Sequence, residues 1–167
     1  LHYSVPEPVD SNQPAQADRT LLIMPSWAKD AGVVVKLVNV VPSNSARSLA
    51  AIQAQVLVAD ADTGAWSTLI DGATLTARRT AAASALAARY LAPKDATTLL
   101  IVGTGRLSLE LAEAHMSVRP SIKRVLIWGR DLAKAETIAS KLEGATAVAD
   151  LSQACAEADV ISCCTLS

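Results

Sequence analysis

The feature that most constrains the fold is an apolar strand pattern that runs into a glycine loop. Residues 99–108 read Leu-Leu-Ile-Val-Gly-Thr-Gly-Arg-Leu-Ser, which is an apolar run, two glycines and the start of a helical pattern. From here, strands and helices are expected to alternate at 98–102, 107–115, 124–128, 132–142, 146–148, 151–156 and 160–164. Such alternation is typical of βαβ units and predicts a doubly wound parallel sheet.

The loop approximates the dinucleotide-binding motif of a Rossmann domain. Gly103 permits a tight turn, Gly105 lets backbone N–H groups approach a pyrophosphate, and the following helix start favours negative charge. Ser108 replaces the third glycine of the motif, so a plain βα turn without a nucleotide stays open as an alternative. The residues predicted to contact the cofactor here are Gly103, Thr104, Gly105, Arg106 and Leu107.

The segment after the second strand of this half bears on the choice of cofactor. In NAD-binding domains an acidic residue at the end of this strand binds the adenosine ribose. Here Trp128 is followed by Gly129, Arg130 and Asp131, so the strand end itself carries no acidic residue. Gly129 and Arg130 can accommodate and pair a 2′-phosphate, which favours NADP(H) and leaves NAD(H) possible. Asp131 has two interpretations, because it can cap the next helix or place a negative charge near that phosphate.

The first half of the chain has a different rhythm. Apolar runs at 21–24, 33–41 and 52–59 are expected strands, and a turn at 60–64 leads into a further strand at 66–70. An Ala-rich helix is predicted from Thr76 to Ala92, stopped by Pro93, whereas residues 1–19 are expected to be irregular. The chain therefore divides into a mainly antiparallel α+β domain (1–93) and an incomplete Rossmann domain (94–167).

Composition excludes several classes of protein. Hydrophobic residues make up 51% of the chain, and 15 Lys and Arg face 16 Asp and Glu, so neither disorder nor polyanion binding is expected. Aromatic residues are only 3%, with no Phe, which disfavours nucleic-acid binding by stacking. No membrane-length apolar run and no signal-peptide pattern are present, so a cytoplasmic location is expected.

The cysteines and histidines show no metal-binding pattern. Cys155, Cys163 and Cys164 lack Cys-x-x-Cys or Cys/His spacing, so they are expected to be buried thiols and no metal site is predicted. Because Cys163 and Cys164 alternate across a strand, at most one can face a cofactor. His115, at a helix end, is expected at the surface or as a partner of the helix dipole at its C-terminal end.

Several motifs in fixed order resemble the ornithine cyclodeaminase/μ-crystallin family. They include Met-Pro at 24–25, Lys-Leu-Val-Asn at 36–39, Asp-Thr-Gly at 62–64, Leu-Thr-Ala-Arg-Arg-Thr-Ala-Ala at 75–82, the glycine loop and Ala-Asp-Val-Ile at 158–161. Members are about twice as long as this chain, which is therefore expected to be a fragment. The resemblance implies a substrate domain and a Rossmann domain with the active site between them, in a homodimer formed through the substrate domains.

The resemblance also implies roles for individual residues. Lys36 and Arg79 would hold the carboxylate of a small amino-acid or imino-acid substrate, Thr80 would lie beside the cofactor, and the catalytic acid/base would lie beyond Ser167. Lys36 interrupts an apolar strand and Arg79 lies in the first turn of a helix, so both placements need a compensating partner. The alternative for Lys36 is a side chain that snorkels from an edge strand. Arg78 is expected to face solvent.

Two departures within the family select a reaction. Cyclodeaminating members carry a glutamate two residues before Met-Pro, where this chain has Leu22. They also favour an acidic residue that binds the ribose of NAD after the second strand, where this chain has Gly129 and Arg130. Both departures favour an NAD(P)H-dependent ketimine reductase that converts a cyclic imine such as Δ1-pyrroline-2-carboxylate to L-proline. Ornithine cyclodeamination, alanine dehydrogenation and a non-catalytic, μ-crystallin-like binding role stay open.

Overall fold

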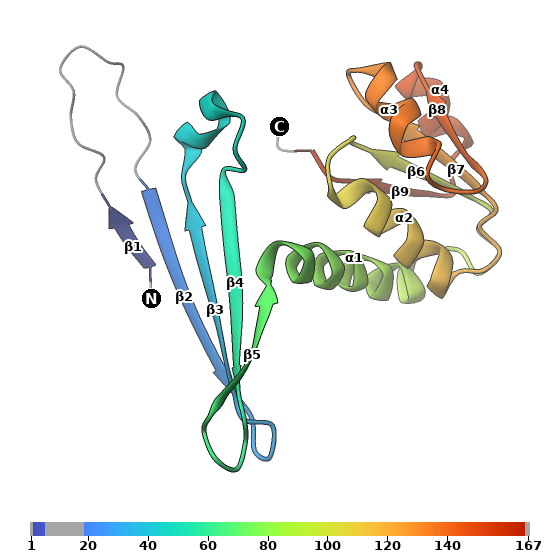
Figure 1. The fold of residues 1–167 in the computed structure, drawn as a ribbon. Coiled ribbons are helices and arrows are strands. Elements are labelled where there is room, and N and C mark those ends of the chain that lie inside the picture. Colours follow the sequence, from blue (N-terminus) through green and yellow to red (C-terminus); the bar gives the residue numbers. More distant parts are fainter. Residues whose placement is uncertain (1, 6–18, 166–167) are drawn as a thin grey trace. The chain divides into compact units, whose positions relative to one another are not determined.

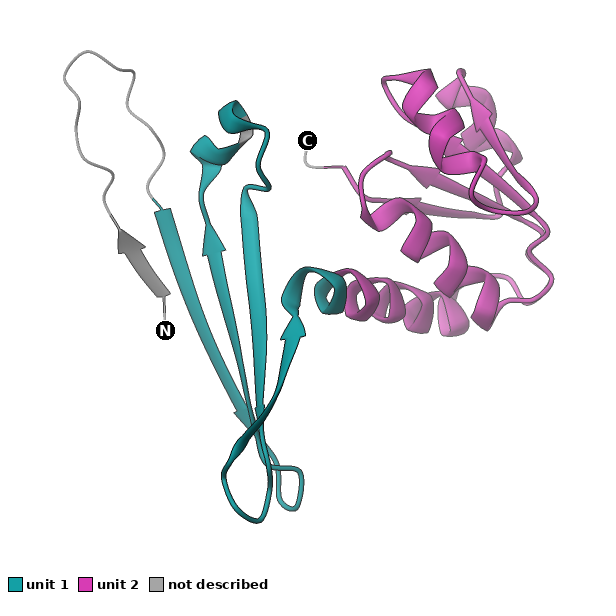
Figure 2. Ribbon diagram, viewed as in Figure 1, with its two compact units in different colours: residues 1–76 teal, residues 77–167 magenta. Residues whose placement is uncertain are grey.

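A computed structural model describes residues 2–5 and 19–165, and the chain divides into two compact units, Leu1–Thr76 and Ala77–Ser167 (Figures 1 and 2). The division falls inside helix α1, which spans Gly72–Leu91. The sequence assigned this whole helix to the first domain, with a boundary after residue 93. Most of the helix belongs to the second compact unit, and the boundary at 93 stays a prediction.

The first unit contains a five-stranded antiparallel sheet in the order β1-β2-β3-β4-β5, which confirms the expected sheet (Figure 1). Its elements are β1 (His2–Val5), β2 (Arg19–Trp27), β3 (Val33–Val40), the 3-10 helix η1 (Pro42–Arg47), β4 (Ile52–Ala59) and β5 (Trp66–Asp71). The predicted hairpin joins β4 and β5, where the Asp60 carboxylate accepts a 2.8 Å hydrogen bond from the backbone N–H of Thr63.

Two details of this sheet differ from expectation. His2–Val5, predicted to be irregular, form β1 and pair with Arg19–Leu22, while the rest of the expected lead-in, 6–18, lies outside the described residues. Strand β2 also continues through Pro25 to Trp27, beyond the end predicted at residue 24. Strand β1 pairs with β2 only as far as Leu22, so within the described residues the part of β2 that contains Pro25 has no neighbour on that side. Such an edge position tolerates proline, which has no N–H to donate.

The second unit contains a four-stranded parallel sheet in the order β8-β7-β6-β9, as the alternating pattern predicted (Figure 1). Its elements are β6 (Thr98–Val102), α2 (Leu107–Val118), β7 (Arg124–Trp128), α3 (Leu132–Ala139), β8 (Ala145–Val148), α4 (Leu151–Glu157) and β9 (Val160–Cys163). Leu99 and Ile101 belong to one buried cluster and Leu100 to another, so the sheet is covered on both faces.

The start of β9 is fixed to the start of β6 by the Asp159 carboxylate. It accepts hydrogen bonds from the backbone N–H groups of Thr97 and Thr98 at 2.8 and 2.9 Å. These bonds to the charged form lower the pKa of Asp159 below its ordinary value. Asp159 therefore aligns the two strands whose far ends border the site described below.

The packing of α1 on α2 corrects one expectation. His115 is only 3% exposed, and its Nε2 atom lies 3.1 Å from the Ser84 hydroxyl oxygen, so of its two predicted positions the surface one is wrong, while it does lie in the last turn of α2. Helix α1 supplies Ser84 as the polar partner. Burial lowers the pKa of His115, which favours the neutral imidazole.

The cysteines correct another expectation, because Cys155 and Cys163 are exposed and Cys164 is half-buried. The described residues contain no cluster of three or more His, Cys, Asp or Glu side chains suited to a metal ion. Every helix in the described ranges is too short or too polar to cross a bilayer.

Candidate functional site

A hollow of about 660 Å³ lies at the carboxyl ends of the parallel strands. It is lined by Val102, Gly103, Thr104, Gly105, Trp128, Gly129, Arg130, Asp131, Lys134, Cys164 and Thr165. The chain runs from β6 to β7 and β8 on one side, and β9 then pairs with the other side of β6. The hollow thus lies at the point where the strand order reverses, which is where open α/β sheets bind ligands.

The two glycines of the loop differ in what the fold requires of them. Gly103 has φ +133°, and a Cβ there would lie 2.7 Å from the Cys164 Sγ atom, so packing alone demands glycine. At Gly105, a Cβ would meet no atom of the described residues within 4 Å, and φ is not in the left-handed region. The fold therefore leaves the Gly105 backbone open, and this fits the close approach of a pyrophosphate.

Ser108 takes the place of the motif's third glycine. Its side chain is completely buried, and its hydroxyl donates a 2.8 Å hydrogen bond to the carbonyl oxygen of Gly103. The serine is small enough for helix and strand to pack closely, and the bond ties the loop to α2. The motif's departure from glycine is therefore compatible with the loop geometry.

The start of α2 differs from the starts of α3 and α4. Asp131 and Asp150 cap α3 and α4 by accepting hydrogen bonds from backbone N–H groups, whereas no side chain in the described ranges caps α2. An uncapped first turn leaves backbone N–H groups able to bind an anion. The helix that follows the glycine loop thus has the end suited to a phosphate group.

The far side of the hollow is formed by the segment after β7. A Cβ on Gly129 would overlap the Thr104 methyl group, so glycine is required where Thr104 packs. Asp131 caps α3, which is one of the two roles predicted for it: its carboxylate accepts a 3.3 Å hydrogen bond from the Lys134 backbone N–H. The same carboxylate lies 3.7 Å from Lys134 Nζ. Arg130 and Lys134 are exposed cations at this side.

Cys164 lies at the opposite side and confirms that at most one of the adjacent cysteines faces the hollow. Its Sγ atom lies 3.5 Å from both the Ser108 hydroxyl and the Val102 carbonyl oxygen. Burial raises the pKa of this thiol, so it packs as a neutral group and is poorly suited to nucleophilic chemistry.

The hollow brings together five of the predicted cofactor residues, namely Gly103, Thr104, Gly105, Gly129 and Arg130. The other three do not line it: Arg106 is exposed before α2, Leu107 packs on the core, and Thr80 is half-buried on α1. Sequence reasoning missed Lys134 and assigned no role to Cys164. Signals for both existed, since Lys134 follows Arg130 at helical spacing and Cys164 ends the strand predicted at 160–164.

Lys36 lies in the first unit, in the middle of the sheet. It pairs with Met24 on β2 and Val56 on β4, so it shares a sheet face with the buried Val56. Its Nζ atom donates a 2.6 Å hydrogen bond to the Thr76 hydroxyl oxygen. The alternative that Lys36 snorkels from an edge strand is therefore wrong, because β3 is a central strand and the ammonium group is bonded within the unit.

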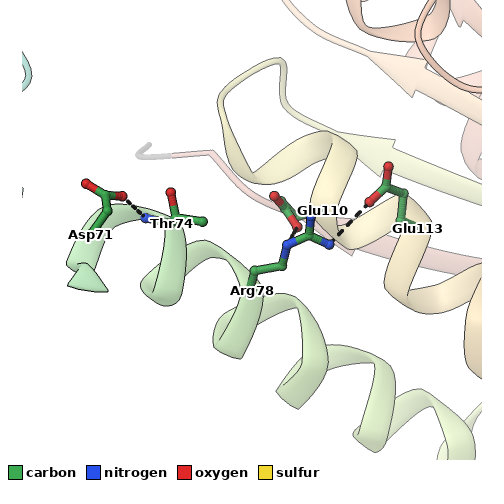
Figure 3. A network of polar contacts seen from close by, with 5 residues as sticks. All are labelled: Asp71, Thr74, Arg78, Glu110 and Glu113. Carbon is green, nitrogen blue, oxygen red and sulfur yellow. Dashed lines mark hydrogen bonds and ion pairs between the residues drawn. The ribbon is translucent and has the colours of Figure 1, made fainter. Parts of the chain in front are cut away.

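The two adjacent arginines of α1 have different surroundings. Arg78 pairs with two carboxylates of α2, at 3.1 Å from Glu110 and 3.7 Å from Glu113 (Figure 3). Its side chain is exposed, as expected, and these exposed pairs contribute little stability. Arg79 is also exposed, and because consecutive residues leave a helix about 100° apart, it points away from the direction of Arg78.

Comparisons with known proteins agree with these features. Residues 3–167 match the model of the ornithine cyclodeaminase/mu-crystallin family. A Δ1-pyrroline-2-carboxylate reductase of Paracoccus denitrificans is 35% identical over 89% of the chain and 48% of its own length. The chain spans about half the length of the curated relatives it matches.

Two solved structures share the fold over nearly the whole chain. A lysine cyclodeaminase that recognises L-lysine, L-ornithine and L-2,4-diaminobutyric acid is 34% identical, with a TM-score of 0.76 over 100% of this chain and 48% of its own. A Thermococcus litoralis Δ1-pyrroline-2-carboxylate reductase in complex with NADH and L-proline is 28% identical, with a TM-score of 0.76 over 98% of this chain and 50% of its own.

Proposed function

The chain belongs to the ornithine cyclodeaminase/mu-crystallin family, and we propose that its protein is an NAD(P)H-dependent reductase of a cyclic ketimine such as Δ1-pyrroline-2-carboxylate, with L-proline as product. The structural observation that carries the proposal is the open backbone of Gly105 in a hollow at the reversal of strand order. The substrate class is supported by the reductase relatives, one of which was solved with NADH and L-proline.

Leu22 supports reduction over cyclodeamination. It pairs with Val38 on β3, so it lies on the same sheet face as Lys36, whose neighbour on β2 is Met24. An aliphatic side chain there provides no charge for the side-chain amine of ornithine, whereas a cyclic imine has no such amine. Cyclodeamination stays the second candidate because of the 34% identity to lysine cyclodeaminase.

The proposed roles divide between two groups of residues. Lys36, as a point charge, and Arg79, as a planar fork, bind the substrate carboxylate and orient the imine. The glycine loop and the start of α2 hold the pyrophosphate, with Thr80 beside the cofactor, in a proposed contact set of Thr80, Gly103, Thr104, Gly105, Arg106, Leu107, Gly129 and Arg130. When bound, the dinucleotide supplies the hydride for the C=N bond.

We propose NADP(H) as the preferred cofactor. Arg130 borders the hollow with an exposed guanidinium group, and Gly129 leaves the adjacent position without a side chain. The Asp131 carboxylate is engaged at the start of α3, where it caps the helix and faces the Lys134 ammonium group. These features suit a 2′-phosphate, while NAD(H) is the alternative that the solved relative with NADH supports.

We also propose a homodimer formed through the sheet of the first unit. One face of this sheet carries exposed apolar side chains, including Trp27 (74% exposed), Val33 (40%) and Leu69 (65%). We take a second copy as the partner that covers this face, because a two-fold dimer buries the same apolar patch of both subunits. Leu69→Asp should convert the dimer to monomer in light scattering after gel filtration; an unchanged mass would contradict this interface.

The first experiment measures oxidation of NADPH and NADH by the full protein with Δ1-pyrroline-2-carboxylate. In parallel, L-ornithine and NAD are tested for ammonia release. Imine-dependent oxidation, faster with NADPH, is expected. Ammonia and L-proline from ornithine without reaction of the imine would establish cyclodeamination instead. If neither assay shows a reaction, the remaining candidates are amino-acid dehydrogenation and ligand binding without catalysis.

A further inference from the structure

Thr76 on helix α1 makes two short hydrogen bonds that concern Lys36. The Lys36 Nζ atom donates to the Thr76 hydroxyl oxygen at 2.6 Å, and that hydroxyl donates to the Gly72 carbonyl oxygen, also at 2.6 Å. A threonine hydroxyl has one donor and two acceptor lone pairs. Since its proton is directed at Gly72, its lone pairs are available to the ammonium group.

Gly72 brings the start of α1 close enough to the sheet for this contact. A Cβ on Gly72 would lie 2.6 to 2.8 Å from the backbone and Cβ atoms of Ala54 on β4. Ala54 pairs with Val38, which lies on the same face of β3 as Lys36. The absence of a side chain at position 72 therefore lets the first turns of α1 pack directly on the sheet face that carries Lys36.

The position of the ammonium group is electrostatically demanding. Lys36 shares its face with Val38, Ala54 and Val56, all buried, so its charge requires polar partners. It also lies beside the first turns of a helix, whose dipole disfavours cations and favours anions. The Thr76 hydroxyl supplies such a partner, because it accepts the 2.6 Å hydrogen bond from Lys36 Nζ.

We propose that Thr76 is a positioning residue, which fixes the Lys36 ammonium group at one place so that it presents a preorganised charge to the substrate carboxylate. This inference rests on the carboxylate-binding role proposed above for Lys36. A lysine side chain loses considerable rotamer entropy when it is immobilised. With Thr76 holding Nζ, much of this loss precedes substrate binding, so the benefit appears in affinity for the carboxylate ligand.

The test compares Thr76→Val, Thr76→Ala and Thr76→Ser in the full protein. Removal of the hydroxyl should weaken L-proline binding in calorimetry and raise KM for the imine about tenfold, because the rotamer entropy of Lys36 would then be lost on binding. We expect kcat and the NADPH dissociation constant to change less than about twofold, since neither measures carboxylate affinity. Thr76→Ser keeps the hydroxyl and should bind L-proline like the unmodified protein.

Two controls make the result decisive. Thr137→Val removes a hydroxyl that makes the same bond to an i−4 carbonyl, from Thr137 to Ala133 at 2.8 Å, and should leave L-proline binding unchanged. Lys36→Met should abolish it. If Lys36→Met abolishes binding while Thr76→Val and Thr76→Ala bind normally, the role of Thr76 is overturned and the proposed function stands. If Lys36→Met also binds normally, the carboxylate role of Lys36 falls, and the inference falls with it.

Discussion

The two sheets of this chain bury their strands to very different degrees. Strand β6 of the parallel sheet reads Thr-Leu-Leu-Ile-Val and is almost completely buried, whereas every residue of β5 in the antiparallel sheet is exposed. Helices and apolar side chains cover β6 from both faces, in two separate core clusters. In the antiparallel sheet, Gly72 at the start of α1 packs on one face, and exposed side chains such as Leu69 and Trp27 lie on the other.

This difference in burial suggests that the parallel sheet provides stability, whereas the antiparallel sheet provides surfaces for contact with other molecules. The parallel sheet supplies a core of its own, so the residues at its carboxyl ends can be arranged for a ligand without weakening the fold. The antiparallel sheet places a lysine on a largely apolar face and leaves apolar residues uncovered, both of which suit contact with another molecule. The following predictions are ordered from the largest expected effect to the smallest.

The largest effect is expected from truncating the parallel core. Leu100→Ala should lower the free energy of unfolding by about 2–5 kcal/mol, since Leu100 is fully buried and its removal leaves a cavity. Leu69→Ala, the same change on the exposed strand β5, should cost less than about 1 kcal/mol in the monomer. Urea denaturation followed by tryptophan fluorescence measures both. Equal losses would show that the contrast between the sheets is wrong.

The adjacent arginines of α1 give the next largest effect. Arg79→Ala should raise KM for the imine about a hundredfold, because a charged bidentate contact is worth about 1.5–3 kcal/mol. Arg78→Ala is the matched control, since Arg78 is committed to Glu110 and Glu113 (Figure 3). It should leave KM nearly unchanged. A larger effect from Arg78 than from Arg79 would reverse the assignment of the substrate-binding arginine.

Sequence reasoning succeeded where structure is local. Strands β6 and β7 begin and end as predicted, because short apolar runs buried on both faces leave little freedom in their boundaries. The start of α1 was placed four residues late, at Thr76 instead of Gly72. The Asp71 carboxylate, which accepts a 2.6 Å hydrogen bond from the Thr74 backbone N–H, was the local signal that marks the true start.

Features that depend on residues distant in sequence escaped prediction. Strand β1 is only four residues long and exists as a strand by pairing with β2. The burial of His115 depends on α1, and the bond from Lys36 to Thr76 joins residues 40 positions apart. No periodicity or propensity encodes such pairs. Sequence motifs therefore identified Lys36 as a candidate but not the hydroxyl group that holds it.

The two loop glycines should respond differently to the same substitution. Gly105→Ala should weaken NADPH binding about tenfold with little change in stability, because its Cβ meets no described atom within 4 Å but occupies the space for a ligand. Gly103→Ala should destabilise the protein by about 1–3 kcal/mol, since it combines a left-handed φ with overlap against Cys164. Cofactor fluorescence titration and thermal unfolding separate the two. Normal NADPH binding by Gly105→Ala would place the cofactor elsewhere.

The smallest expected effect is a pH dependence of stability that originates in the second unit. Burial holds the pKa of His115 below its ordinary value of 6.5, so the unfolded chain takes up a proton that the folded protein does not as pH falls below 6.5. The contribution of His115 is therefore complete above this pH, decreases as pH falls toward the lowered folded-state pKa, and then levels off. His115→Gln removes the titration and retains a polar side chain near Ser84. Its stability should fall less steeply between pH 6.5 and 5 than that of the unmodified protein in urea denaturation, and parallel curves would assign the pH dependence to other groups.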